Sequence, residues 1–358
     1  MAKTARTPKK PRAKVLATAS FSFDALSLAK NLLAGISERG REVLTLRFGL
    51  GTKNTRETLE FIGERWSITR ERVRQIEASG IEAIRSSRVF KEAEGSFGEL
   101  SSYVESLGAI VPEDHLLNEL AGDEKTRNAF RFLLVVGSAF FRERETDHFY
   151  ARWHVDHKTA EKVHQALSRL YATLSDEEVV SEAELFTRFI EELKDVNTAY
   201  HNEEVLKRWL SLSKTIDKNP LSEWGRAHAP AVRTKGIRDY AYLVIKRENA
   251  PMHFKNVANA ITELFSKKAH VATTHNELMK DSRFVLVGRG LYALAEWGFA
   301  PGVVRDVIRD LLKKKPLTRD EVLSEVKRKR YVKDNTILVN LNDTRYFKRQ
   351  KDGTYGLA

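Results

Sequence analysis

Apolar residues recur at helical spacing in the first part of the chain. Residues 21–36 carry them at steps of three and four, which predicts an amphipathic helix. A second helix is predicted from Ser37 until the turn-prone residues 49–54 end it. Thr58 and Thr69 are suited to capping helix N-termini, so a third helix is predicted through Trp66 and a fourth to about residue 87. The tight turn at residues 67–68 makes this pair a helix-turn-helix.

The fourth predicted helix carries polar side chains opposite its apolar stripe. Four of them occupy its first turns: Arg70, Glu71, Arg74 and Gln75. In a helix-turn-helix these turns meet base edges in the major groove, where Arg suits guanine, Gln suits adenine and Glu suits cytosine. The alternative is a solvated face with internal ion pairs, such as Glu71 with Arg74, and periodicity alone does not separate the two.

The charge of the chain is unevenly distributed. Its 358 residues carry a net charge of +12, with six cations and no acid in residues 1–14 and 15 cations against eight acids in residues 298–358. Such basic ends favour a polyanionic partner, and a solubilising role is the alternative. Residues 1–19 are too polar and too rich in cations to bury a core, so a disordered basic arm is predicted.

Other features restrict the class of protein. The chain has no cysteine, which excludes disulfides, thiol nucleophiles and cysteine-ligated zinc. No apolar run reaches the ~18–20 residues of a membrane span, and no apolar segment follows the first cations. We therefore expect a cytoplasmic, nucleoid-associated protein that is neither exported nor membrane-bound.

Three segments carry a family resemblance: residues 44–50, 58–65 and 68–78. Together they closely resemble region 4 of primary-type sigma factors over about residues 35–85. The resemblance implies that Arg70, Glu71, Arg74 and Gln75 contact bases of a promoter −35 element. It also implies that Arg47, Thr69 and Arg72 lie near the DNA backbone, and that the domain docks on RNA polymerase.

The chain also departs from that family. Phe61 stands where the family usually has Glu, which removes a reciprocal capping box, and Ser79-Gly80 stands where it has Lys-Ala. Gly80 should cost roughly 1 kcal/mol relative to Ala within a helix. In sigma factors region 4 is C-terminal, whereas only about twenty residues precede the predicted helix-turn-helix domain here. We therefore expect a protein other than an ordinary complete sigma factor.

The rest of the chain predicts small units of helices followed by a hairpin. Residues 237–261 predict helices, and residues 284–297 predict a hairpin that turns at 288–290. The segment 236–298 resembles the HARE winged-helix domain, which is shared with the RNA polymerase delta subunit. Residues 299–358 predict a second basic unit of the same kind, with helices at 303–314 and 320–331 and a hairpin from Ile337 to residue 357.

The middle of the chain is less informative. Helices are predicted near 101–107, 115–120 and 127–136, and a hairpin at 140–155 turns at 146–147. Residues 221–225 repeat the pattern of 294–298, so a further winged unit is predicted to end near Ala229. The expected domains are 1–19, 20–90, 96–157, 158–235, 236–298 and 299–358. The fold class is mainly α, with an N-terminal four-helix helix-turn-helix domain followed by tandem winged-helix units.

Enzymatic interpretations have little support. His154, Asp156 and His157 could belong to a metal site, but the sequence indicates no further ligand to complete it. Glu325 and Lys327, with Asp310 or Asp320, imitate a nuclease site but fall on a predicted helix. We predict no catalytic residue, metal, cofactor or small-molecule ligand.

We expect a non-enzymatic transcription regulator whose partners are double-stranded promoter DNA and RNA polymerase core. Three alternatives stay open. They are a repressor or activator without polymerase, a delta-like polymerase accessory protein, and the specificity arm of a restriction or repair system.

Overall fold

The computed structural model describes residues 20–299 and 302–358, so the predicted basic arm at 1–19 lies outside the described residues. The chain divides into two compact units. Of the described residues, one unit comprises 20–173 together with 183–217, and the other comprises 174–182 together with 218–299 and 302–358. The predicted fold class, mainly α with helix-turn-helix and winged-helix units, is confirmed. No helix in the described ranges is both long and apolar enough to cross a membrane.

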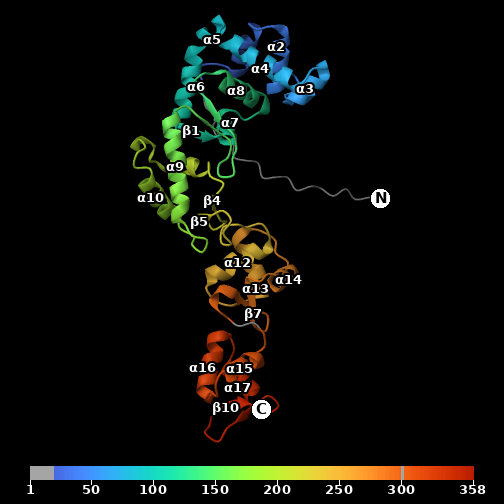
Figure 1. The fold of residues 1–358 in the computed structure, drawn as a ribbon, viewed down its shortest axis with the longest axis vertical. Helices are drawn as coiled ribbons and strands as arrows, with labels where there is room; N and C mark the ends of the chain where they lie inside the picture. Colours follow the sequence, from blue (N-terminus) through green and yellow to red (C-terminus); the bar gives the residue numbers. More distant parts are fainter. Residues whose placement is uncertain (1–19, 300–301) are drawn as a thin grey trace, which may run out of the picture. The chain divides into compact units, whose positions relative to one another are not determined.

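The first unit begins with the predicted helices. They are α1 (Ala25–Ala34), α2 (Glu38–Phe48), α3 (Leu59–Trp66) and α4 (Arg70–Arg85), followed by the short α5 (Arg88–Glu92) (Figure 1). The predicted caps form, because the Thr58 hydroxyl accepts from the Phe61 amide at 3.2 Å and the Thr69 hydroxyl accepts from the Arg72 amide at 3.2 Å. The helix-turn-helix is thus present at the predicted residues.

A winged-helix arrangement follows in the same unit. Its elements are α6 (Glu94–Ser106), β1 (Ile110–Pro112), α7 (Glu113–Leu120), α8 (Glu124–Val136), β2 (Phe141–Glu143) and β3 (Arg152–His154). The strands form an antiparallel sheet in the order β1-β3-β2, in which Trp153 pairs with Val111 on one side and Arg142 on the other. The predicted hairpin is confirmed, whereas the three-residue β1 had no sequence signal.

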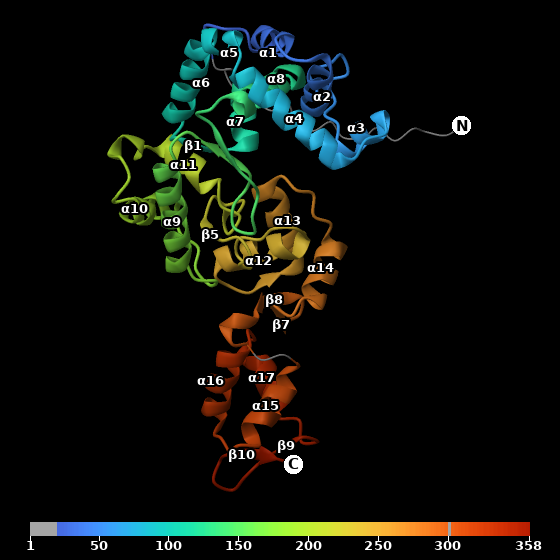
Figure 2. The ribbon, with the colours of Figure 1, turned by 45° about the horizontal axis from the view of Figure 1, so that its top comes forward.

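One hydrophobic core joins the helix-turn-helix region to this winged-helix region. Leu32 and Leu44 belong to the same buried cluster as Leu100, Phe132 and Leu133. Helix α8 packs against α1, α2 and α4, as Figure 2 shows. Arg85 near the end of α4 donates to the carbonyls of Val136 at 2.9 Å and Val135 at 3.0 Å. The segments predicted as separate domains at 20–90 and 96–157 therefore share one hydrophobic core.

Further helices complete the first unit: α9 (His157–Thr173), α10 (Glu182–Glu192) and α11 (Glu203–Leu210). The buried Trp209 of α11 donates to the Gly108 carbonyl at 3.0 Å, and Arg208 donates to the Leu107 carbonyl at 2.8 Å. Strands β4 (Ile216–Lys218) and β5 (Trp224–Arg226) lie where the chain passes from one unit to the other. The winged unit predicted to end near Ala229 spans this boundary and stays a prediction.

The second unit contains the segment predicted at 236–298. Its elements are α12 (Ile237–Glu248), β6 (Met252–His253), α13 (Phe254–Phe265), α14 (Val271–Lys280), β7 (Phe284–Gly288) and β8 (Leu291–Leu294). The sheet order is β6-β8-β7, with all neighbours antiparallel. The hairpin predicted to turn at 288–290 is confirmed, and Gly290 has a φ of 70° that glycine adopts without strain.

The C-terminal segment differs from its prediction in one element. It consists of α15 (Val304–Leu312), α16 (Arg319–Lys329), α17 (Asp334–Leu341), β9 (Phe347–Arg349) and β10 (Tyr355–Leu357). The hairpin predicted from Ile337 is wrong at its start, because Ile337 lies in α17 and the strands begin at Phe347. The physical reason is packing: Ile337 and Leu341 are buried one helical turn apart, while Val339 is 73% exposed.

Candidate nucleic-acid interface

The turn between α3 and α4 is held by a small core and by backbone conformation. Val43, Ile62 and Val73 are fully buried against one another. Ser67 has a φ of 54°, and a Cβ on Gly63 would lie 2.6 Å from the Ile68 carbonyl oxygen. Only glycine fits at residue 63 without a shift of the backbone. This geometry fixes the direction in which α4 leaves the turn.

The four predicted base-contacting side chains share one exposed face of α4. We call Arg70, Glu71, Arg74 and Gln75 the base-recognition face, and each of its residues is exposed. Arg74 donates from Nε to Glu71 Oε2 at 2.8 Å and from Nη2 to Oε1 at 2.7 Å, and these bonds lower the pKa of Glu71. Arg70 pairs with Glu60 of α3 at 3.0 Å. Water screens such exposed pairs, so they give way readily to a stronger partner.

The three residues predicted to lie near the DNA backbone differ in their contacts. The Thr69 hydroxyl caps α4, and the exposed Arg72 donates to Gln75 Oε1 at 3.0 Å. Arg47 donates to the Glu57 carbonyl at 3.2 Å and lies 3.4 Å from Glu77 of α4. Burial raises the pKa of Glu77, although Arg47 acts in the opposite direction. Arg47 therefore links α2, α4 and the loop between α2 and α3.

Gly80 has a packing role that sequence reasoning missed. Helix α4 continues through it to Arg85. A Cβ at residue 80 would lie 3.1 Å from Leu44 Cδ1 and 3.9 Å from the Cα of Gly40. The absence of a side chain therefore lets α2 and α4 approach closely, which compensates for the low helix propensity of glycine. The departure from the family pattern leaves the helix intact.

Asn128 of α8 is a further residue that sequence reasoning missed. It is fully buried and donates to the carbonyls of Gly49 at 3.2 Å and Asn54 at 2.9 Å. Gly49 has a φ of 66°, and a Cβ there would lie 2.7 Å from the Asn128 amide nitrogen. The loop before α3 is thus held by a residue about 75 positions away. Nothing in the local sequence signals this contact.

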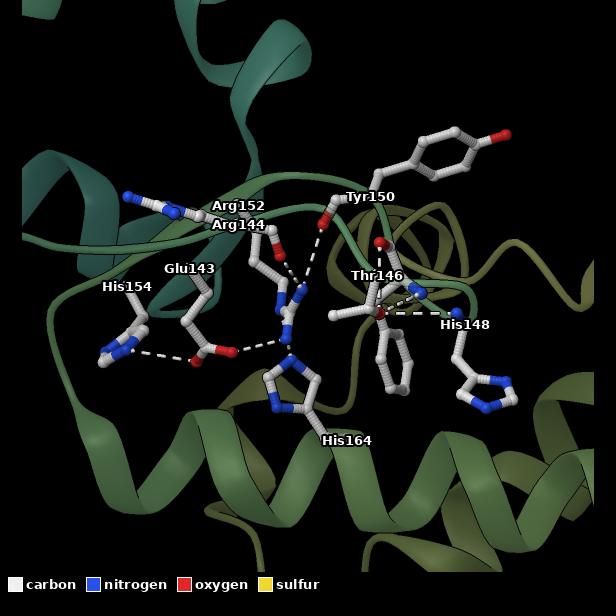
Figure 3. A network of polar contacts seen from close by, with 9 residues as sticks. Glu143, Arg144, Thr146, His148, Tyr150, Arg152, His154 and His164 are labelled. Carbon is white, nitrogen blue, oxygen red and sulfur yellow. Dashed lines mark hydrogen bonds and ion pairs between the residues drawn. The ribbon is translucent and has the colours of Figure 1, made fainter.

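The hairpin formed by β2 and β3 takes part in a polar network with α9 (Figure 3). Arg152, which is 4% exposed, donates to His164 Nε2 at 2.6 Å and also bonds to Glu143. His154 Nε2 lies 3.3 Å from Glu143. Burial, together with the charge of Arg152, lowers the pKa of His164 to about 4. The neutral ring accepts the arginine hydrogen bond, so the network ties β2 and β3 to α9.

The other side chains considered for enzymatic chemistry lie apart from one another or in ion pairs. Glu325 and Lys327 lie on α16, where Lys327 pairs with Asp334 at 2.5 Å. Asp310 lies on α15 and pairs with Lys313 at 3.5 Å. Within residues 20–299 and 302–358, no group of three or more His, Cys, Asp or Glu side chains is arranged to hold a metal ion.

A short helix, a left-handed turn and a second helix with exposed Arg, Glu and Gln side chains define a helix-turn-helix, a class of motif that is typical of DNA-binding proteins. Residues 32–86 match the family model for sigma-70, region 4. This matched part is sigma-factor-like, and it covers a minor share of the chain.

Known sigma factors are similar to this part of the chain. The RNA polymerase sigma factor RpoS of Coxiella burnetii is 49% identical over 67 residues, which cover 19% of this chain and 18% of that protein. The RNA polymerase sigma factor RpoD of Helicobacter pylori (strain ATCC 700392 / 26695) is 46% identical over 57 residues, which cover 16% of this chain and 8% of that protein. The chain thus spans less than a fifth of the length of these curated relatives.

Proposed function

We propose that the protein binds promoter-type double-stranded DNA and acts with RNA polymerase in transcription initiation. One observation carries the proposal: the match of residues 32–86 to sigma-70 region 4 includes the whole exposed face of α4. Arg70 and Arg74 donate to guanine, Gln75 pairs with adenine and Glu71 accepts from cytosine in this proposal. Arg47, Thr69 and Arg72 are proposed to contact the backbone.

A selection from a random duplex library tests base recognition. The full chain should enrich a motif, and the variant Arg74→Ala should enrich a motif that is degenerate at one base pair. The variant Arg88→Ala is the matched control, because Arg88 is an exposed arginine of α5 outside the base-recognition face. Equal enrichment of all sequences by the full chain would contradict the proposal.

Co-purification with polymerase core distinguishes the proposed role from that of a repressor or activator that works without polymerase. We expect the native protein to retain polymerase core at moderate salt. Mapping of bound sites in the genome should then place them just upstream of transcription starts. Binding to promoters without retention of polymerase would favour the stand-alone regulator.

A second candidate function is that of a polymerase accessory protein resembling the delta subunit. The observation that favours it is the order α12-β6-α13-α14-β7-β8 in residues 236–298, which suits a HARE-type winged helix. In this case polymerase would be retained while the library selection enriched no motif. DNA cleavage that depends on a divalent metal and requires a partner subunit would instead favour a restriction or repair system.

A further inference from the structure

A cavity lined by charged and apolar side chains lies in the first unit, where the helix-turn-helix region meets the following winged-helix region. Its volume is about 180 Å³. Residues of both regions line it, and they include four arginines: Arg47, Arg56, Arg131 and Arg142. Two carboxylates, Glu77 and Glu113, and the side chains of Phe48, Val135 and Trp153 complete the lining. We call this space the arginine cavity.

The carboxylates do not balance the cations of the arginine cavity. Glu113 bonds to Arg142 and lies 3.9 Å from Arg131, and Glu77 pairs with Arg47 at 3.4 Å. Arg56 has no ion-pair partner in the part of the chain that the structure describes. Four arginines against two carboxylates leave a net charge of two positive units in the lining.

The excess positive charge affects Arg131, one of the four arginines of the arginine cavity. The side chain of Arg131 is only 14% exposed. Burial lowers the pKa of Arg131 and the nearby charge of Arg56 lowers it further, although the charges of Glu113 and Glu124 act in the opposite direction. A partly buried charge without a full set of counter-charges is unfavourable, and an anion would relieve it.

Two hydrogen-bond donors of the lining also lack acceptors. Trp153 is 2% exposed, and its indole Nε1 has no partner among the described residues. The same holds for Arg131 Nε, because the 3.9 Å to Glu113 is too long for a hydrogen bond. Both groups can only donate, and a buried donor without an acceptor is costly. An oxyanion would supply acceptors together with negative charge.

We propose that the arginine cavity binds a phosphoryl oxyanion. Its volume is below the ~300–1,000 Å³ of pockets that enclose whole drug-sized ligands, so a single phosphoryl group fits it better than an entire nucleotide. The group belongs either to a free phosphate compound or to the backbone of bound DNA. The site is distinct from the base-recognition face, because no residue of that face lines it and because Arg131, Arg142 and Trp153 lie outside the sigma-like residues 32–86.

The test uses the full chain, with the indole ¹H–¹⁵N signal of Trp153 as the readout. Inorganic phosphate is titrated against potassium chloride of equal ionic strength, and a short duplex of random sequence is titrated separately. Arg56→Gln removes the partnerless cation, and because Arg56 is exposed this variant should fold. Arg131→Gln is the second variant, and the exposed Arg88→Gln is the matched control.

For a free phosphate compound we expect a saturable shift of the Trp153 signal by phosphate. Its affinity should fall about tenfold in Arg56→Gln, which is the loss of one charge-assisted hydrogen bond, and stay unchanged in Arg88→Gln. For a DNA phosphate we expect the duplex alone to shift the signal. Arg56→Gln should then reduce the slope of log affinity against log salt by about one.

The site proposal is overturned if neither phosphate nor duplex moves the Trp153 signal, or if Arg88→Gln weakens binding as much as Arg56→Gln. The same titrations on Arg74→Ala keep this outcome separate from base recognition. Retained phosphate binding in a protein without sequence preference would reject the proposed function and leave the arginine cavity supported.

Discussion

The base-recognition face and the C-terminal winged-helix segment arrange their cations differently. Arg74 of α4 is paired with Glu71 at 2.7 Å, and Arg70 is paired with Glu60 of α3 at 3.0 Å, so hydrogen-bond donors and acceptors lie side by side on this face. Strand β9 and the turn that follows it instead carry three exposed cations with no ion-pair partner among the described residues: Lys348, Arg349 and Lys351. We call these three the wing cations. Directed mixtures suit base edges, whereas undirected charge suits phosphates.

The two compact units also contain different partly buried groups whose pKa values are lowered. The first unit contains His164, whose pKa is lowered to about 4 by burial and by Arg152. The second contains Asp281, whose pKa is lowered by the hydrogen bonds of Arg283, at 2.6 Å from Nη2 to Oδ2. A histidine and a carboxylate with lowered pKa values destabilise the folded chain in different pH ranges. The two units should therefore lose stability at different pH values.

The largest expected effect is acid destabilisation of the first unit. Since the unfolded chain binds a proton at His164 below pH 6.5 and the folded chain does so only near 4, stability should fall as the pH drops through this window. The loss is up to about 3 kcal/mol before solvent screening reduces it. The second unit should hold until the pH falls below 3.8, where unfolded Asp281 takes up its proton. Urea unfolding of the full chain across these pH values measures both steps.

Variants assign the first step to its residue. His164→Gln should weaken the dependence between pH 6.5 and 4, because glutamine accepts the Arg152 hydrogen bond without titrating, while His154, whose pKa burial also lowers, keeps its own contribution. His228→Gln is the control, since His228 is exposed and belongs to the second unit. An unchanged pH dependence in His164→Gln would contradict the assignment.

The support that α8 gives to the helix-turn-helix should also be measurable. Asn128→Ala leaves the buried carbonyls of Gly49 and Asn54 without their donor, which should cost about 1 to 3 kcal/mol of unfolding free energy. Chemical denaturation measures this loss. Asn118→Ala provides the control, because Asn118 is exposed on α7 of the same unit. Equal stability of the two variants would show that the loop before α3 does not depend on α8.

Loss of a base-contacting side chain should weaken binding to one kind of duplex only. Arg74→Ala should lose ~1–3 kcal/mol of binding free energy on a promoter-like duplex and almost none on a random one. Titrations of both duplexes at one salt concentration measure the difference, with Arg88→Ala as the control. Equal losses on the two duplexes would make Arg74 a backbone contact and remove the contrast with the wing cations.

Local signals predicted the helix-turn-helix well. The caps at Thr58 and Thr69 and the turn at Ser67 depend on neighbours within three or four residues, so the sequence contains them. The hairpins at 140–155 and 284–294 were found for the same reason. The strands β1 and β6 are three and two residues long, too short to show a period.

The features that could not be predicted depend on packing between residues far apart in the sequence. Ile337, Val339 and Leu341 recur at every second position as in a strand. A strand would place all three on one face, whereas the core accepts only Ile337 and Leu341. The contacts of Asn128 with the loop before α3 and the meeting of four arginines in one cavity join distant parts of the chain. No pattern within either part indicates the other.

The wing cations provide the smallest and most uniform expected effect. Replacing Lys348, Arg349 and Lys351 by alanine should weaken binding to promoter-like and random duplexes alike, because phosphate contacts release counterions without recognising bases. If all three touch phosphates, the slope of log affinity against log salt becomes shallower by about 2 to 3. A triple alanine variant of Lys125, Lys158 and Lys194 removes the same charge from exposed positions of the first unit and controls for net charge. Titrations at several salt concentrations measure both slopes. If the triple variant lost more affinity for the promoter-like duplex than for the random one, the wing cations would take part in base recognition. If the two triple variants had equal salt slopes, the wing cations would contribute only the general attraction of a basic protein for DNA.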